Sequence, residues 1–500
     1  MCCKIYNDDM KLKLIKRFLP FSSLLFPIIA FQSLFFCMGC SSRMDDEPVY
    51  VFRNATVIDA VYGVRTGHSV IVHGNRIKEL GPVDNINEPS GATIIDCSGK
   101  YLIPGLWDAH VHLLDGGKNL PPDKMFPLFI VNGITYVRDT SGYLDLLLAL
   151  REEASQLKGM APRVFITGPH IDGLQFSWDH SFRLVSAEQA AWAVDSLVRA
   201  GVDQIKVYEL PSPEVYFGVL ARANEHGYRV SGHVPLTMDV IEASNAGLGS
   251  MEHMRNLELS CSSDWDSLLK ARQQIISEGT DKTGNELRSG IYAAQRLHAI
   301  QTQDAERRNL VLNTLAENET WQVPTLTLTA AAEHRMYSTE ARIQSFRYLP
   351  EPTRSDWKER VLLRAGQSPT EERLALALWA YDMIPRLIEF GIPIMAGTDM
   401  PLAQLTPGFS LHEELILLEW AGMTPLQVLE SATLGPAKFL GLEKAQGSIA
   451  KDMVADLVIL NANPLENIAN TQKINAVMRD GHLHTREDLD IILYNLESSR

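Results

Sequence analysis

The stretch "GLWDAHVHLLDGG" (residues 105–117) lies where the pattern of the chain changes, and it carries two histidines two positions apart. An apolar run that begins at Tyr101 precedes His110 and His112. In a β-strand, residues i and i+2 project from the same face, so both imidazoles can reach one ion at a strand end. Two histidines also fall this close by chance, so the rest of the chain has to supply the other ligands.

Before this stretch, short β-rich runs alternate with Gly, Asn and Pro. Examples are "VYVFRNATVIDA" and "HSVIVHGNRIKELGP", and similar runs return near the other end of the chain as "ADLVILNANP" and "INAVMRDGHLHT". Runs of this kind predict strands and hairpins. We therefore expect a small β-sandwich domain formed by both chain ends, from residues 49–104 and 436–490, with a C-terminal tail at 491–500.

Within residues 105–435, apolar runs typical of strands alternate with amphipathic stretches such as 186–200 and 212–226. About eight such units predict a (β/α)8 TIM barrel inserted in the β-sandwich, so the expected fold class is α/β. The alternative is an open, doubly wound sheet, which the lack of a Gly-rich phosphate motif after the first strand disfavours. Two long helical stretches, 255–320 and 329–388, are expected to cap the site face or to mediate oligomer contacts.

The N-terminus has the layout of a secretory signal. From Met10, a basic segment is followed by an apolar run over 18–36 and then by small residues. We expect 1–39 to be a signal peptide that starts at Met10, with Cys40 as the lipidated first residue of the mature protein and 40–48 as a tether. The protein would then be exported and lipid-anchored in the bacterial cell envelope. An uncleaved transmembrane anchor is the alternative, because the apolar run is long enough to span a bilayer.

Composition narrows the classes of partner. The formal net charge of −15 repels phosphate backbones, so no nucleic acid is expected. Of six cysteines, only Cys97 and Cys261 would remain as free thiols, and they fall in different predicted domains, so no disulfide framework is indicated. The expected partners are a small-molecule substrate and, through the N-terminal lipid, a membrane. An oligomer stays open.

Four further residues stand at predicted strand ends. Burial would lower the pKa of Lys206, and a neutral amine can add carbon dioxide to become an anionic carbamate that bridges two metal ions. Its alternative role is a simple pairing with Glu209. His233 in "SGHVP" and His253 in "SMEHM" end consecutive strands, where a lone histidine is otherwise hydrogen-bonded core. Asp399 in "AGTDMP" follows a buried strand, where a carboxylate needs a cation, donors or a helix to cap.

Taken together, the order His-x-His, Lys, His, His, Asp resembles the amidohydrolase superfamily, in its binuclear subtype with a carboxylated lysine. The segments "PGLWDAHVHL", "IKVYE", "SGHVP", "MEHM" and "AGTDMP" match successive motifs of that family. The flanking runs resemble its β-domain and final helices, so the resemblance covers nearly all of residues 49–490. Within the superfamily, "IKVYE" with "GHVP" resembles the imidazolonepropionase-like and Xaa-Pro dipeptidase-like branch.

The resemblance implies a centre with two divalent metal ions. One ion would be bound by His110, His112 and Asp399, the other by His233 and His253, and carboxylated Lys206 would bridge both. Zinc is the expected metal, with manganese, iron and cobalt as alternatives. A hydroxide between the ions would attack the scissile carbonyl, and Asp399 would act as catalytic base and then as acid toward the leaving nitrogen.

The resemblance favours a metal-dependent amidohydrolase that cleaves an amide or peptide bond of a small substrate, either a dipeptide or an N-acyl amino acid. Tyr208 lies two residues after Lys206 on the same strand face, where it can bind a substrate carboxylate, donate to the oxyanion, or form part of the barrel wall. The loop "GPHIDGLQFSWDH" offers further pocket residues, or loop packing, at His170, Asp172, Trp178 and His180.

Three rival functions stay open beside this one. A lactonase or phosphotriesterase-like hydrolase would use the same two-metal site on another bond, because a fold does not determine the reaction. A cyclic-amide hydrolase or deaminase is the second. The third is a non-catalytic, lipid-tethered binding protein, which is disfavoured because no ligand position is replaced.

Overall fold

The structure, a computed structural model, describes residues 47–115, 120–332 and 340–498. These residues form a mixed α/β fold whose strands make three sheets. The predicted signal peptide (1–39) and the predicted lipidation residue Cys40 lie outside the described residues. Among the helices that the structure describes, none is both long enough and apolar enough to cross a bilayer.

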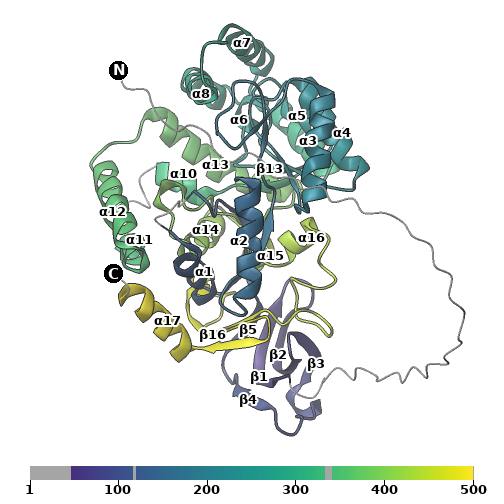
Figure 1. Cartoon of the computed structure of the whole chain (residues 1–500), viewed down its shortest axis with the longest axis vertical. Coiled ribbons are helices and arrows are strands. Elements are labelled where there is room, and N and C mark those ends of the chain that lie inside the picture. The colour runs from purple at the N-terminus through teal and green to yellow at the C-terminus, as the bar shows by residue number, and fades with distance from the viewer. Residues whose placement is uncertain (1–46, 116–119, 333–339, 499–500) are drawn as a thin grey trace, which may run out of the picture. The chain divides into compact units, whose positions relative to one another are not determined.

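Both ends of the described chain contribute to one eight-stranded sheet (Figure 1). Its strands are β1 (Val49–Asp59), β2 (Gly63–His73), β3 (Arg76–Pro82), β4 (Thr93–Asp96), β5 (Tyr101–Pro104), β15 (Leu457–Leu460), β16 (Ile474–Arg479) and β17 (His482–Thr485). Their order is β17-β16-β15-β5-β1-β2-β3, and β4 pairs with β1. Leu457 of β15 lies opposite Pro104 of β5 in antiparallel pairing, so backbone hydrogen bonds join the two chain ends.

The inner face of this sheet has its own apolar core, which includes Phe52, Val70, Leu102 and Ile459. The β-sandwich prediction is supported in part. Both chain ends contribute strands as expected, but hydrogen bonds join these strands into one continuous sheet, because β15 from the C-terminal side pairs directly with β5. The domain boundaries stay predictions.

Two further sheets are parallel throughout. The first has the order β6 (Leu106–Val111), β7 (Ile134–Asp139) and β8 (Arg163–Ile166). The second has the order β10 (Phe182–Arg183), β9 (Ile171–Asp172), β11 (Ile205–Val207), β12 (Val230–Gly232), β13 (Leu248–Glu252) and β14 (Trp321–Val323). Segment 394–400 joins the two sheets, because Ile394 bridges Gln322 and Met400 bridges Val111.

Hydrogen bonds do not close these strands into the continuous ring that the barrel prediction requires. Between β8 and β11, a backbone hydrogen bond runs from Asp203 N to Ile166 O at 2.8 Å, without a paired ladder. Pro169 follows β8 and has no N–H to donate. The two-residue strand β9 lies beside Val207 of β11 instead. A parallel α/β arrangement is therefore established, and the closed barrel stays a proposal.

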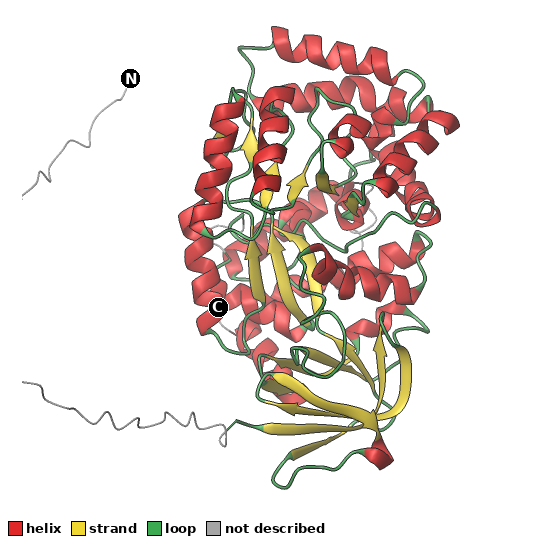
Figure 2. Cartoon of the chain, turned by 90° about the vertical axis from the view of Figure 1, so that its right-hand side faces the viewer, coloured by secondary structure: helices red, strands yellow, loops and turns green. Residues whose placement is uncertain are grey.

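Helices surround the parallel strands, most of which are buried along their whole length (Figure 2). They include α1 (Pro122–Val131), α2 (Leu144–Gln156), α3 (Ala187–Ala200), α4 (Pro213–Glu225), α5 (Val240–Asn245), α14 (Phe409–Trp420), α15 (Pro425–Ser431) and α16 (Leu434–Phe439). The chain closes with α17 (Arg486–Ser498), which follows β17. The two long stretches singled out in the sequence are helical as well: α6 (Leu257–Ser260), α7 (Trp265–Glu278), α8 (Gly284–Gln301) and α9 (Ala305–Glu317), then α10 (Leu326–Ala332), α11 (Glu340–Ser345), α12 (Glu351–Ala365) and α13 (Glu371–Glu389).

Local sequence sets where several of these helices begin and end. The Ser186 side chain accepts a hydrogen bond from the backbone of Gln189 at the start of α3, and Thr283 forms a capping box with Glu286 at the start of α8. Such caps satisfy backbone donors that the first helical turn leaves free. Gly201 adopts the left-handed conformation that ends α3 and leads the chain into β11, the strand that carries Lys206.

Candidate functional site

The structure brings the six predicted metal ligands together at one end of the parallel strands. His110 lies in β6 and Lys206 in β11, whereas the others directly follow a strand or lie in segment 394–400: His112, His233, His253 and Asp399. Carboxyl ends of parallel strands meet at one edge, so these side chains converge although they are far apart in sequence. All of them except His110, which is fully buried, line a cavity of about 130 Å³ together with Tyr208.

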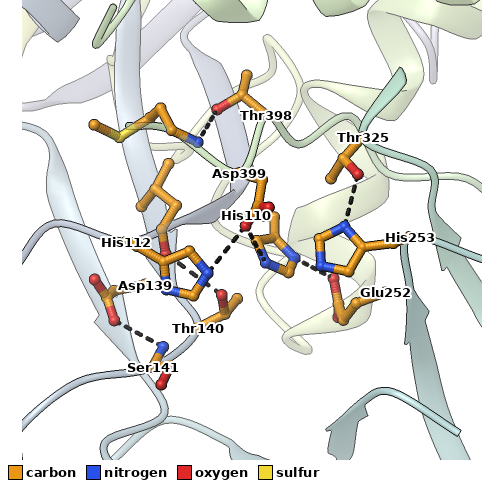
Figure 3. A network of polar contacts seen from close by, with 12 residues as sticks. His110, His112, Asp139, Thr140, Ser141, Glu252, His253, Thr325, Thr398 and Asp399 are labelled. Atoms are coloured by element: carbon orange, nitrogen blue, oxygen red, sulfur yellow. Dashed lines mark hydrogen bonds and ion pairs between the residues drawn. The ribbon is translucent and has the colours of Figure 1, made fainter. Parts of the chain in front are cut away.

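Asp399 lies close to His110 and His112, the two histidines that are predicted to bind the same metal ion (Figure 3). Its Oδ1 is 3.1 Å from His110 Nε2 and 3.0 Å from His112 Nε2. Yet Asp399 Oδ1 and His110 Nε2 are buried without a properly oriented hydrogen bond. Ligand atoms of His110, His253 and Asp399 all lie within 4.8 Å of one another. Unprotonated nitrogens and a carboxylate that converge in this way suit a divalent cation.

The imidazoles of three predicted ligands are held through Nδ1. His110 Nδ1 lies 2.6 Å from Glu252 Oε2, and His233 Nδ1 lies 2.7 Å from Glu209 Oε1. His253 Nδ1 lies 2.7 Å from the hydroxyl of Thr325, as Figure 3 shows. With Nδ1 engaged, the Nε2 atoms of His110 and His233 are left buried and without a properly oriented hydrogen bond. This carboxylate–imidazole arrangement is the usual support of a metal-binding histidine, so the donor set fits a metal centre.

Sequence reasoning missed the supporting glutamates. The sequence suggests Glu209 only as a partner for Lys206, whereas the structure places it beside His233. Glu252, which precedes His253, supports His110 and also accepts from Arg138 Nη2 at 2.9 Å. The sequence does contain a signal for such a role, because a carboxylate that is buried beside a histidine needs a hydrogen-bond donor. Burial would raise the pKa of Glu252, but the charges of Arg138 and His110 outweigh it and hold that pKa well below its usual range.

Lys206 is buried next to these histidines and lines the cavity. Burial lowers the pKa of its ammonium group to about 8, since the nearby carboxylates of Glu252 and Asp399 compensate only in part. A neutral amine, the form that can take up carbon dioxide, is therefore accessible at mildly alkaline pH. Burial also lowers the pKa of His233 to about 3, which keeps this imidazole neutral, as a metal ligand requires.

Backbone geometry at the site is restrictive. Asp399 and His253 have φ values of +66° and +59°, a left-handed conformation that is uncommon outside glycine and concentrates at functional sites. Gly397 lets segment 394–400 approach His110, because a Cβ at position 397 would lie 2.7 Å from the Cβ of His110. Gly232 precedes His233, and a Cβ there would lie 2.1 Å from the carbonyl oxygen of Val207. The motifs "AGTDMP" and "SGHVP" thus need their glycines for close packing.

Tyr208 connects the centre to the insert helix α8. Its hydroxyl accepts hydrogen bonds from Arg288 and, at 3.2 Å, from Trp178 Nε1. Its ring lies 4.4 Å from that of His170 and 4.6 Å from that of His233. Arg288 was not identified from the sequence, because nothing in the pattern of α8 shows which of its residues faces the strands.

The predicted loop residues divide into two groups. His170, Trp178 and His180 line the cavity, and the Oγ of Ser141 lies 2.6 Å from both His170 Nδ1 and His180 Nε2. Asp172 is packed away from the cavity lining, where its carboxylate accepts the backbone N–H groups of Gly173, Ser177 and Leu210. Asp172 therefore shapes the loop, and its predicted place in the pocket is not seen.

Comparison with known sequences matches part of the chain to one family model. Residues 379–483 match the model of the Amidohydrolase family. A dihydroorotase from Trichlorobacter lovleyi is 38% identical over 73 residues, which are 15% of this chain and 17% of that protein. A dihydroorotase from Pelobacter propionicus is 24% identical over 433 residues, 82% of this chain and 89% of that protein. In the matches to the first curated relatives, the chain thus covers about a sixth of their length.

Solved structures with the same fold cover most of the chain. A Xaa-Pro dipeptidase with bound methionine in its active site has a TM-score of 0.61 at 19% identity, over 87% of this chain and 100% of the other. Bottromycin amidohydrolase has a TM-score of 0.67 at 22% identity, over 91% of this chain and 92% of the other. At these identities the likeness establishes a shared fold.

Proposed function

We propose that the chain is a member of the amidohydrolase superfamily and a metal-dependent hydrolase of an amide or peptide bond in a small substrate, either a dipeptide or an N-acyl amino acid. The observation that carries the proposal is the convergence of His110, His253 and Asp399, whose ligand atoms lie within 4.8 Å of one another beside buried Lys206. The similarity to a Xaa-Pro dipeptidase supports the class of bond.

The proposed function is accompanied by a proposed fold, the closed barrel. The strands of the two parallel sheets, with segment 394–400 between them, would form the (β/α)8 barrel with its carboxyl ends at the site. The isolated bridges at Ile394 and Met400 support this arrangement, since they continue the parallel pairing on both sides of the segment. Export and lipid anchoring at Cys40 rest on the N-terminal sequence and complete the proposal.

Each ligand has a distinct place in the proposed centre. His110, His112 and Asp399 would hold one divalent ion, His233 and His253 the other, and carboxylated Lys206 would lie between them. Metal ions bound there would activate a water molecule at neutral pH and polarise the scissile carbonyl. Asp399 would accept the proton of the attacking water on its carboxylate and deliver it to the leaving nitrogen. Glu209 and Glu252 hold the imidazoles of His233 and His110 in the required orientation.

Tyr208 and Arg288 are the proposed substrate-positioning pair. They are hydrogen-bonded to each other beside His233, and both line the cavity. A phenol and a guanidinium together offer donors to a carboxylate or to the developing oxyanion. The lining combines histidines and charged side chains with the apolar side chains of Trp178, Leu328 and Leu402.

Metal content is the measurement that tests the proposal. The protein is prepared with zinc and bicarbonate, and bound metal per chain is measured for the wild type, Lys206→Ala, and the exposed-lysine control Lys270→Ala. We expect close to two ions in the wild type and control, and clearly fewer in Lys206→Ala. One ion regardless of Lys206 would favour a mononuclear enzyme such as a deaminase, and no ion in folded protein would contradict a metal centre.

A substrate panel then tests the reaction. Dipeptides and N-acyl amino acids are compared with lactones and phosphotriesters on the metal-loaded protein. Turnover of the amides supports the proposal, whereas turnover confined to lactones or phosphotriesters would replace it with the rival hydrolase.

A further inference from the structure

A second, larger cavity opens beside the candidate centre. Its volume is about 450 Å³, and it shares His253, Arg255 and Leu328 with the cavity at the ligands. Ligand pockets usually measure roughly 300–1,000 Å³, so the 130 Å³ cavity is too small for a whole substrate. The part of the substrate that extends past His253 therefore has the second cavity available. We call it the insert chamber, since α8 and α13, which pack against each other, supply much of its wall.

Both acidic side chains of the insert chamber are engaged by one arginine. Its two acids, Glu258 and Glu372, both pair with Arg296, at 3.2 Å from Nε and 3.0 Å from Nη1. Arg296 also lies over the ring of Tyr292, with its guanidinium carbon 3.8 Å from the ring centroid. One arginine thus engages both carboxylates, and neither of these acids pairs with Arg255 or Arg373.

Arg255 and Arg373 bring positive charge to the insert chamber. Arg255 stands between the two cavities, and its nearest acid in the described chain is Glu209, 3.7 Å from its Nε. Its Nε is buried without a hydrogen-bond partner, an uncommon state for a guanidinium. Arg373, at the start of α13, is exposed at the rim, and no ion pair joins its side chain to another described residue. The chain is acidic overall, so such a concentration of positive charge marks a place for an anion.

We infer that the insert chamber binds a carboxylate on the part of the substrate that extends past His253, so that the preferred substrates carry an acidic side chain or a dicarboxylic acyl group. This inference rests on the proposed function and narrows its substrate class. Arg255 would bind the carboxylate through its guanidinium, which suits the planar geometry of that group. Arg373 would attract it at the entrance.

Matched dipeptides that differ only in charge test the inference. The metal-loaded protein is given Glu-Ala with Gln-Ala, and Ala-Glu with Ala-Gln. We expect kcat/KM for one glutamyl dipeptide to exceed that of its glutaminyl partner by about tenfold, as for a charge-assisted contact. Which pair shows the preference identifies the side of the scissile bond that faces the chamber. Equal kcat/KM within both pairs would overturn the inference.

Substitutions of Arg255 and Arg373 test whether these two arginines cause the preference for the glutamyl dipeptide. Arg255→Gln and Arg373→Gln are each expected to lower the Glu-to-Gln ratio of kcat/KM by about threefold or more, the range of an exposed to partly buried charge contact. Arg386→Gln is the control, because Arg386 lies on α13 like Arg373 but outside the insert chamber, where it pairs with Asp382. If Arg255→Gln does not fold, Arg373→Gln at the rim carries the test. A ratio unchanged in the folded variants would overturn the inference.

A binding measurement separates this inference from the proposed reaction. Glutarate and its neutral analogue glutaramide are titrated into the same proteins by calorimetry. Tighter binding of glutarate that Arg255→Gln or Arg373→Gln weakens supports the chamber as an anion site, even if no amide is hydrolysed and the proposed function fails. Glutarate binding that is equal in the wild type and both variants overturns it.

Discussion

At the scale of single residues, Asp399 has the most demanding environment in the site. Its carboxylate is buried between His110 and His112, on a backbone in the left-handed conformation. Burial alone would raise the pKa of Asp399, but the nearby His253, His110 and His112 hold it well below its usual range. The carboxylate therefore stays ionised at neutral pH, the form that can accept a proton from water.

Replacing Asp399 tests its proposed role. In Asp399→Asn, we expect kcat to fall by about 10²–10⁴-fold, because the amide cannot accept the proton. Steady-state kinetics on metal-loaded protein checks the result, with metal content and the midpoint of thermal unfolding measured alongside. Asp452→Asn is a matched control, since Asp452 has a similar φ of +67° and lies on the surface. Full activity in Asp399→Asn would contradict the role.

At the scale of secondary-structure elements, α8 is connected to the site by hydrogen bonds. Tyr292 of α8 donates to Glu209 Oε2 at 2.7 Å, and the other oxygen of Glu209 pairs with His233 Nδ1. Arg288 of the same helix bonds the Tyr208 hydroxyl. A helix from an insert thus orients a predicted ligand, although it contributes no ligand of its own.

Tyr292→Phe should loosen the support of His233. We expect the affinity for the more weakly held metal ion to fall by about tenfold, the lower end of the effect of losing a support to a metal ligand. Competition with a chromophoric chelator measures the affinity without any need for a substrate. Tyr216→Phe is the control, because the buried hydroxyl of Tyr216 has no hydrogen-bond partner. Equal affinities in the wild type and Tyr292→Phe would show that α8 does not support the centre.

A second contact between elements predicts sensitivity to acid. His412 of α14 donates through Nε2 to the carbonyl of Asn132, at the end of α1, at 3.0 Å, and its Nδ1 lies 2.9 Å from the hydroxyl of Thr471. Burial lowers the pKa of His412 to about 4, and the hydrogen bond to Asn132 offsets this only in part. The ordinary value is about 6.5. As pH falls below 6.5, the unfolded chain therefore takes up this proton before the folded chain does.

The free energy of unfolding should accordingly decrease between pH 6.5 and 4, by up to about 3 kcal/mol from this one group. Urea unfolding at several pH values measures the slope. In His412→Gln the slope over this range should be shallower than in the wild type, because the group that titrates is gone. His482→Gln, at an exposed position, should retain the wild-type slope. The same slope in His412→Gln would contradict the assignment.

At the scale of the whole molecule, a cluster of charges joins the sheet of the chain ends to the parallel strands. Arg163 of β8 lies 3.4 Å from Asp456 Oδ2 and 3.0 Å from Asp480 Oδ1. Asp456 is buried, its Oδ1 accepts the backbone N–H of Asp480, and its carbonyl accepts the N–H of Gly105. Gly105 begins the stretch that leads into β6, so the cluster lies where the chain passes from one sheet to the other.

Asp456→Ala should destabilise this junction by about 2 kcal/mol, the usual effect of losing hydrogen bonds to a charged group. The loss arises because Arg163 and the backbone of Asp480 are left without their partner. Urea unfolding at pH 7 gives the change in free energy. Asp490→Ala removes an exposed partner of Arg486 and should change stability by less than about 0.5 kcal/mol. Equal effects of the two substitutions would contradict a structural role for the cluster.

The sequence by itself predicted the resemblance to a family, the parallel α/β arrangement and the set of residues that meets at the site. These predictions rest on local patterns. The spacing of His110 and His112, and polar residues placed directly after apolar runs, indicate side chains at strand ends. Parallel strands place their carboxyl ends at one edge, so Lys206, His233 and Asp399 could be grouped without knowing any contact.

Only the tertiary structure decided how these residues are held and what surrounds them. His110 meets Glu252 across 142 positions, and Tyr292 meets Glu209 across 83. Whether β15 pairs with β5, and which residues of α8 face the site, depends likewise on how distant elements pack. Periodicity describes one element at a time, whereas these contacts arise from the packing of several elements, and their geometry exists only in the folded chain.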